Sequence, residues 1–335
     1  MKTSTRFNRF PTTFISATLI IVCFSLPASL RAREDKTDSA QQLFASPDDA
    51  VKSLIEAARN KDRPGMHKLF GPDAHDMVTG DEVQDANNFE SFAKAVQDKC
   101  TPEPEGDNKV VLNIGVERWP FPIPLVKKDG HWLFDTDAGR EEIINRHIGR
   151  DELNAIGVCR AYAQAQSDYF NAAPEGGVKK YAEKFKSSAG KKDGLYWESD
   201  ASKGSSPLGA LVTEARAEGY GRSNSDGSPQ PFHGYYFKIL RKQGAAAPGG
   251  SRSYMRHRAM TDGFALVAYP ANWDHSGIMT FIVNQDGKVY QCNLGEKTEK
   301  IAQGMTKYNP DSNWTMVKED GRIEDLTEMR KRATP

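Results

Sequence analysis

Helical periodicity over residues 140–170 is the feature that most constrains the fold of this chain. Apolar residues recur there at spacings of three and four, and Gly149 predicts a break before the main stripe. The segments 235–240, 264–269, 279–284 and 288–294 follow, and their β-branched and aromatic content is typical of strands. A helix followed by a block of strands predicts an α+β fold. The stripe consists of Leu153, Ile156, Cys159, Ala163, Gln166 and Phe170.

A length of 335 residues suits two ordinary domains. The sequence predicts an N-terminal α+β domain over 44–148 and a C-terminal helix-plus-sheet domain over 149–320. A charged tail at 321–335 and a disordered lead-in at 33–43 are expected to flank them.

Helices are predicted first in the N-terminal domain, at 47–60, 64–70 and 88–99. Ser46 before Pro47 has the pattern of a helix start. Strands are predicted at 110–116 and 131–135, with a hairpin turn at 128–130. The prolines in 119–125 indicate an extended edge or a polyproline II segment.

This element order and the strand pattern DGxWxFD resemble the nuclear-transport-factor-2-like (NTF2-like) fold of helices on a curved antiparallel sheet. The resemblance covers residues 44–140. Because that fold hosts enzymes, ligand carriers and interaction modules, it implies little about function.

The C-terminal half resembles the globular heads of pilins and pseudopilins, in which a long helix precedes a four-stranded antiparallel sheet. The strings GYYFKIL, GFALVAYPANW and SGIMTFIVNQDGKVYQ carry this resemblance. The whole chain also resembles an uncharacterised family of exported bacterial proteins, domain of unknown function 2950. FASPDDAVKSLIEAA, WPFPIPLV and GHWLFDTDAGREEIINRHIGRDEL belong to that match, which brings no known activity with it.

The first 32 residues have the three-part layout of a cleavable secretory signal. Basic residues precede an apolar run at 14–26, and small residues at 28–32 offer cleavage positions. The run is too short and too interrupted for a spanning helix, so no integral membrane segment is expected after cleavage. A lipoprotein would use Cys23, but Val22 stands where a small residue is needed. We therefore expect a periplasmic or secreted protein.

Charge excludes one class of partner. The chain carries 45 basic and 45 acidic residues, and removal of residues 1–32 takes away four basic residues and no acidic one. The mature chain then has a net charge of about −4, which argues against a dedicated nucleic-acid binder. Cys100, Cys159 and Cys292 remain, permitting at most one disulfide, and buried reduced cysteines are favoured.

Familiar catalytic and cofactor fingerprints are missing from the sequence. No GxSxG, HExxH or GxGxxG pattern occurs, and the glycine-rich 244–251 lacks the lysine of a phosphate-binding loop. The seven histidines are dispersed, and Asp73, His75 and Asp76 are interpreted as a loop rather than a metal site. No catalytic, cofactor-binding or metal residue is assigned.

Two surfaces remain as candidates for a ligand or partner. One is the charged segment after 134 together with a proline-framed tryptophan, and the other is a basic loop at 241–258. The candidate residues of the first surface are Trp119, Asp135, Glu142, Arg146 and His147. Those of the second surface are Arg252, Arg256 and Arg258. Solvated charges and packing between domains are the competing interpretations of both.

The leading hypothesis is a non-enzymatic interaction or assembly module of the cell envelope, with an envelope protein or a cell-surface polymer as partner. One alternative is an exported hydrolase with Asp135 or Glu142 acting beside His147 in an interdomain cleft. Another is a small-ligand carrier with a pocket in the N-terminal domain.

Overall fold

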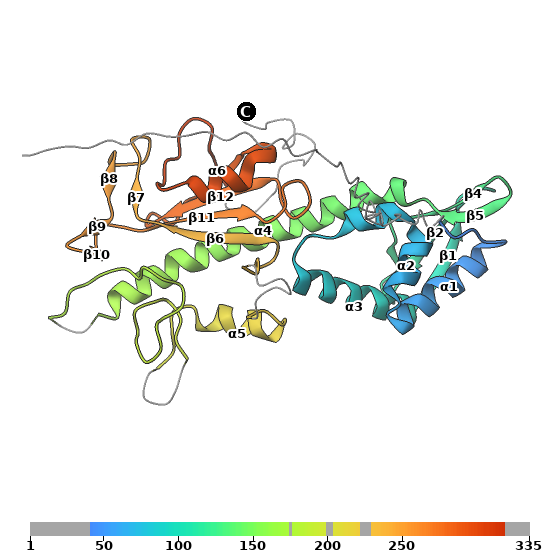
Figure 1. Cartoon of the computed structure of the whole chain (residues 1–335), viewed down its shortest axis with the longest axis horizontal. Helices are drawn as coiled ribbons and strands as arrows, with labels where there is room; N and C mark the ends of the chain where they lie inside the picture. Colours follow the sequence, from blue (N-terminus) through green and yellow to red (C-terminus); the bar gives the residue numbers. More distant parts are fainter. Residues whose placement is uncertain (1–40, 174–175, 199–203, 222–228, 319–335) are drawn as a thin grey trace, which may run out of the picture. The chain divides into compact units, whose positions relative to one another are not determined.

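The computed structural model describes residues 41–173, 176–198, 204–221 and 229–318 (Figure 1). These residues lie in one compact unit that begins at Ser39. They form helices and antiparallel sheets, which confirms the predicted α+β class. The signal predicted at 1–32, most of the lead-in and the whole of the tail at 321–335 lie outside the described residues.

Local capping explains where the first helix begins. α1 (Pro47–Asn60) has the predicted bounds, and the Ser46 hydroxyl accepts a hydrogen bond from the backbone N–H of Asp49 at 3.2 Å. α2 (Arg63–Phe70) and a 3-10 turn, η1 (Pro72–Met77), follow. Just before α1, the side-chain amide of Gln41 donates to the carbonyl oxygens of Leu69 and Phe134, so this end of the predicted lead-in is anchored.

α3 (Glu82–Asp98) begins six residues before the predicted start at residue 88. Its cap is Asp81, whose Oδ1 accepts from the backbone N–H groups of Val83 and Gln84, each at 3.1 Å. A buried aspartate at this position satisfies donors that a helix end otherwise leaves unpaired.

The first sheet has the order β1-β2-β4-β5, with β3 paired to β2. β1 was not predicted, because its two prolines disfavour a strand; at a sheet edge, where β1 lies, they are tolerated. The hairpin between β4 and β5 turns at Asp129 and Gly130, both with positive φ, as predicted. The strands are β1 (Cys100–Pro104), β2 (Lys109–Ile114), β3 (Trp119–Pro120), β4 (Leu125–Lys128) and β5 (His131–Phe134).

α4 (Thr136–Asn171) is one continuous helix of 36 residues, so the break predicted at Gly149 is wrong. Glycine costs about 1 kcal/mol in a helix interior relative to alanine, which the flanking turns offset here. The predicted stripe is also wrong at Leu153, whose side chain is 46% exposed, whereas Ile156, Cys159 and Gln166 are buried.

The second sheet has the antiparallel order β14-β13-β12-β11-β6 and contacts α4 and α6 (Figure 1). The four predicted strands are confirmed, and a two-residue edge strand adds to them. Both faces of β11 are buried, as expected for an interior strand. The elements are β6 (Tyr235–Leu240), β11 (Ala265–Pro270), β12 (Met279–Asn284), β13 (Val289–Asn293), β14 (Thr315–Met316), α5 (Gly209–Ala217), η2 (Gly295–Lys297) and α6 (Thr298–Gly304).

Buried hydrophobic residues form two clusters that meet along α4. One runs from Phe44 to Phe134 in sequence and the other from Ile148 to Val317. Ile143 packs against the first cluster and Ile144 against the second. Because α4 contributes to both cores, the division into two domains at residue 148 stays a prediction.

A buried polar junction ties α3 to the C-terminal part of the chain. Besides capping α3, Asp81 accepts from the Tyr220 hydroxyl at 2.9 Å and from the backbone N–H of Gly234 at 3.1 Å. The Gln84 side chain donates to Asp151 Oδ1, and Asp151 is fully buried on α4. The two halves are therefore joined by hydrogen bonds as well as by the shared helix.

The junction predicts a pH-dependent stability. Burial raises the pKa of Asp151 to about 7, although hydrogen bonding from Gln84 and the charge of Arg150 lower it. Since the folded pKa lies above the unfolded value near 3.8, this stabilisation is present below about pH 4 and is lost as pH rises through 7. Between pH 6 and pH 8 the free energy of unfolding should fall by about 1 kcal/mol from this group alone.

Urea unfolding of the wild type and Asp151→Asn at both pH values checks this prediction. The asparagine variant keeps the acceptor for Gln84 but cannot ionise, so its decline should be smaller by that amount. The contribution of His147 to stability changes with pH in the opposite direction, because burial and then the charge of Arg150 lower the pKa of His147 to about 4. Its contribution is the same in both proteins and cancels. An equal fall in the free energy of unfolding of the two proteins would contradict the raised pKa of Asp151.

Candidate functional site

Three of the residues singled out in the sequence meet on the surface of α4. Trp119 is 39% exposed, and the Arg146 guanidinium lies 5.1 Å from the centroid of its ring. The Nε of Arg146 donates to Glu142 Oε1 at 2.6 Å. A cation–π contact at an exposed site contributes about 0.5–1 kcal/mol, so this cluster also has a structural role.

Asp135 and His147 do not join that group. Asp135 is the N-cap of α4 and accepts from the backbone N–H of Ala138 at 3.3 Å. His147 is largely buried, and its Nδ1 has no hydrogen-bond partner within the described part of the chain. No hydrogen bond in that part joins His147 to Asp135 or Glu142.

The N-terminal core shows tight aromatic packing where a carrier would need space. The ring centroids of Phe70 and Phe134 are 5.1 Å apart, and those of Phe92 and Phe121 are 5.3 Å apart. Such distances are typical of rings in direct contact.

The basic loop forms two short hairpins joined at Tyr254. We call residues 241–260 the arginine hairpins; they contain β7 (Lys242–Gln243), β8 (Arg252–Ser253), β9 (Met255–Arg256) and β10 (Ala259–Met260). Tyr254 is fully buried, its hydroxyl donates to Gln243 Oε1 at 2.9 Å, and its N–H donates to the Arg241 carbonyl oxygen. This anchor leaves Arg252, Arg256 and Arg258 exposed on the outside.

The tip of the second hairpin carries side chains on a strained backbone. His257 and Arg258 have φ of 49° and 66°, in the left-handed region that favours glycine. Arg256 is paired with Asp262 at 2.8 Å, whereas Arg258 has no ion-pair partner within the described residues. A charged residue held in a strained position is a common feature of functional sites.

The strain predicts that Arg258→Gly raises the free energy of unfolding by about 0.5–1 kcal/mol. Arg256→Gly is the matched control, because Arg256 lies in β9 and has no positive φ. It should lower stability, through the lost ion pair and the entropy of glycine in a strand. Urea unfolding of both variants measures the effects. Destabilisation by Arg258→Gly as large as that of the control would refute the strain.

A second group of cations lies beside the arginine hairpins. We call residues 178–193 the lysine loop, and its lysines are all exposed: Lys179, Lys180, Lys184, Lys186, Lys191 and Lys192. Gln166 on α4 holds the loop, since its side-chain amide exchanges two hydrogen bonds of 2.8 Å with the backbone of Ala182. The N–H of Tyr181 donates to the Met260 carbonyl oxygen at 2.7 Å. Backbone pairing therefore fixes the lysine loop against β10.

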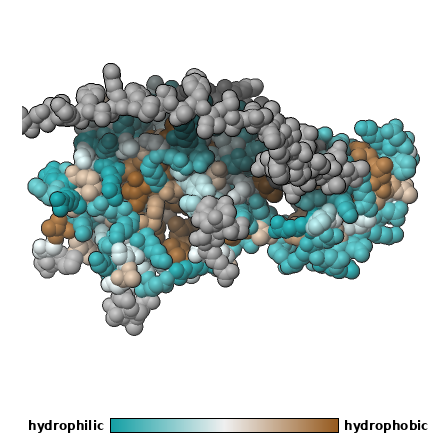
Figure 2. Space-filling model, viewed as in Figure 1, coloured by the Kyte–Doolittle hydropathy of each residue, from teal (hydrophilic) through white to brown (hydrophobic). Residues whose placement is uncertain are grey.

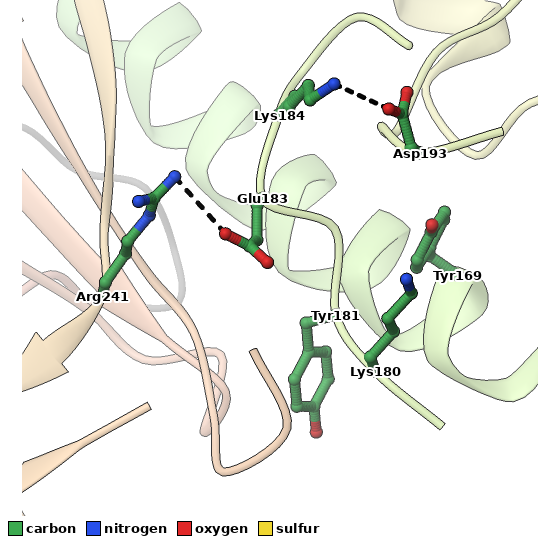
Figure 3. Close-up of a pocket in the computed structure, with 7 residues that line it drawn as sticks. All are labelled: Tyr169, Lys180, Tyr181, Glu183, Lys184, Asp193 and Arg241. Atoms are coloured by element: carbon green, nitrogen blue, oxygen red, sulfur yellow. Dashed lines mark hydrogen bonds and ion pairs between the residues drawn. The ribbon is translucent and has the colours of Figure 1, made fainter. Parts of the chain in front are cut away.

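A shallow pocket of about 210 Å³ marks the junction of the two segments (Figure 3). In it, Arg241 approaches Glu183 at 3.4 Å and Lys184 contacts Asp193 at 2.7 Å. The hydrogen bond from Lys184 lowers the pKa of Asp193. The lining residues are Tyr169, Lys180, Tyr181, Glu183, Lys184, Asp193 and Arg241. One ion pair, Arg241–Glu183, thus joins the hairpins to the lysine loop across the pocket, and the other, Lys184–Asp193, lies within the loop.

Together the lysine loop and the arginine hairpins form what we call the cationic surface. The loop supplies six basic residues and the hairpins five, namely Arg241, Lys242, Arg252, Arg256 and Arg258. Glu183 and Asp193 of the loop and the neighbouring Asp262 are its acidic residues. Figure 2 shows that the surface over β7–β10 is mainly hydrophilic on the face in view. Such local excess charge attracts anionic partners.

Sequence reasoning identified only the hairpin half of this surface. The lysine loop was not singled out there, although six lysines in so short a segment are a usable signal. The contact between segments that lie about 60 residues apart in the sequence had no such signal, because it depends on packing around α4.

The other features of the described residues give less support for a functional site. A second pocket is lined by Pro270, Ala271, Asn272, Trp273, Glu296 and Glu299. Within the described residues none of Cys100, Cys159 and Cys292 forms a disulfide, and the last two are buried, as favoured from the sequence. Within the described residues no group of His, Cys, Asp and Glu is arranged to hold a metal ion. The side chains of Asp73, His75 and Asp76 lie outside the description.

Comparison with known proteins places the chain in a family. The model described as protein of unknown function (DUF2950) matches residues 41–317, which is most of the chain and nearly all of its described part. No curated protein and no solved structure matches. The narrower resemblances to pseudopilin heads and to the NTF2-like fold therefore stay predictions.

Proposed function

The chain belongs to the DUF2950 family of proteins of unknown function, and we propose that it is an exported cell-envelope protein that docks to an anionic partner through the cationic surface. It acts as a binding module and not as an enzyme. The observation that carries this proposal is the pairing of the lysine loop with the arginine hairpins in an otherwise mildly acidic mature chain.

Export is supported by the layout of the N-terminus. Basic residues, an apolar run and small residues follow one another within residues 1–32. In the described part of the chain, no helix has the length and hydropathy needed to cross a bilayer. An exported protein of this kind meets envelope components that carry phosphate or carboxylate groups.

Electrostatics supports docking rather than catalysis. Exposed lysines and arginines attract anions over about one Debye length, roughly 8 Å at physiological ionic strength. Arginine adds specificity, because its guanidinium binds phosphate or carboxylate through two parallel hydrogen bonds. The candidate acid–base residues Asp135, Glu142 and His147, by contrast, are not brought together. Binding should therefore weaken as salt is added.

Photo-crosslinking in intact cells tests the proposal. A photoreactive amino acid replaces Arg258 at the hairpin tip, or Lys128 in the distant β4–β5 hairpin as a matched control. We expect an adduct with an envelope component from position 258 that disappears when Arg252 and Arg256 are both changed to glutamate. Equal adducts at the two positions, or retention of the protein in the cytoplasm, would contradict the proposal.

A further inference from the structure

We propose that the anionic partner is the headgroup surface of a lipid bilayer, onto which the cationic surface docks peripherally with Val178 as its apolar contact. This inference rests on the proposed function and deepens it by naming the partner. The observation behind it is an exposed hydrophobic side chain placed directly within the lysine loop.

Val178 is 76% exposed, although burial of a valine side chain away from water is favourable. Gly177 precedes it and Lys179 and Lys180 follow it, all exposed. An apolar side chain flanked by lysines is typical of segments that bind the interface of anionic membranes. A soluble polyanion would use the lysines but would leave the valine in water, so Val178 favours the bilayer.

The position of Val178 relative to the hairpins is limited by backbone geometry. Tyr181 is hydrogen-bonded to Met260, and Val178 lies three residues before Tyr181. Three residues span at most about 11 Å, so the valine and the arginine hairpins lie within reach of one membrane patch. The stacking of Tyr181 on Phe170 of α4, with centroids 4.6 Å apart, fixes the start of the loop.

The charges are arranged to act at such a surface. Of the eleven basic side chains, Lys184, Arg241 and Arg256 are held in ion pairs with acids. Arg258 projects from a strained turn, and its guanidinium suits a phosphodiester. Basic residues next to an anionic leaflet each contribute about 1 kcal/mol, or about fivefold in affinity.

Vesicle flotation with the mature chain tests the inference. Phosphatidylglycerol mixed with phosphatidylcholine should bind the protein, whereas phosphatidylcholine alone should not, and added salt should release it. Val178→Asp should weaken binding about tenfold or more, and the double variant Lys179→Glu/Lys180→Glu should weaken it at least as much. Glycerol phosphate in solution should not displace the protein, which separates a bilayer from free phosphate.

Matched controls come from the first sheet. Val116 is 78% exposed in the turn between β2 and β3, so Val116→Asp repeats the valine substitution away from the cationic surface. Lys127→Glu/Lys128→Glu repeats the charge reversal on the exposed β4–β5 hairpin. Both controls should bind vesicles as the wild type does. All the substituted positions are exposed, and thermal unfolding verifies that each variant is folded.

The outcomes distinguish the inference from the proposed function. Full binding by Val178→Asp, or equal binding to both kinds of vesicle, would overturn the bilayer assignment. If vesicles do not bind while position 258 still crosslinks in cells, the partner is a protein or a polysaccharide; the proposed function then stands and this inference fails. If crosslinking also fails, both are wrong.

Discussion

Replacing Glu152 with alanine should lower the free energy of unfolding by about 4 kcal/mol. Glu152 is buried on α4, and its Oε1 accepts from the backbone N–H groups of Ile278 and Met279, both at 2.9 Å. These bonds hold α4 to the start of β12. Alanine would leave two buried donors unpaired, at about 1–3 kcal/mol each, and would open a cavity.

Glu152→Gln is the control for this prediction. Burial raises the pKa of Glu152 to about 7, although the two backbone hydrogen bonds lower it. The neutral acid is therefore the main form at pH 6, and glutamine has nearly the same shape, charge and acceptor. Guanidinium chloride unfolding at pH 6 should show a loss of less than about 1 kcal/mol for glutamine. Similar losses for both variants would mean that the hydrogen bonds contribute little.

Gly139→Ala should lower the free energy of unfolding by about 3 kcal/mol, even though alanine normally strengthens a helix. A Cβ at Gly139 would lie 2.7 Å from the backbone nitrogen of Ile123 and 2.7 Å from the carbonyl carbon of Pro122. Backbone atoms cannot turn aside as a flexible side chain can. α4 would have to move away from the segment that follows β3, and overpacking of this kind typically costs 1–3 kcal/mol.

Gly149→Ala and Gly157→Ala test the same helix where space is free. A Cβ at either position meets no atom within 4 Å. Each substitution should raise the free energy of unfolding by about 0.5–1 kcal/mol. Chemical unfolding of the three single variants measures the contrast directly. If Gly139→Ala also stabilises the protein, the close approach of α4 to Pro122 and Ile123 is not present in solution.

Local signals predicted much of the fold. The Ser46–Pro47 start gave α1 its correct bounds, and β-branched and aromatic content located the principal strands of the second sheet. These features depend on residues near in sequence, as caps and hairpin turns do. The α+β class followed from their order.

Elements that depend on tertiary partners were missed. β1 contains two prolines and forms because an edge strand needs no donor on its outer side. α3 starts early because Asp81 is held by Tyr220 and Gly234, which lie far away in sequence. Gly149 did not break α4, because packing against two cores sets the length of that helix.

The candidate site was predicted only in part, because one half of it also depends on contacts between residues far apart in the sequence. Composition alone identified the arginines of 241–258, and Trp119, Glu142 and Arg146 do meet. The contact between the arginine hairpins and the lysine loop depends on the hydrogen bond from Tyr181 to Met260 and on those of Gln166 to Ala182. No periodicity in the sequence reports such contacts.

Fractionation of cells that export the protein tests the central claim most directly. The wild type should be exported and recovered with the envelope, and a high-salt wash should release it. A variant with Lys179, Lys180, Arg256 and Arg258 all changed to glutamate should be exported equally well but recovered in the soluble fraction. An unchanged distribution of this variant would contradict docking through the cationic surface.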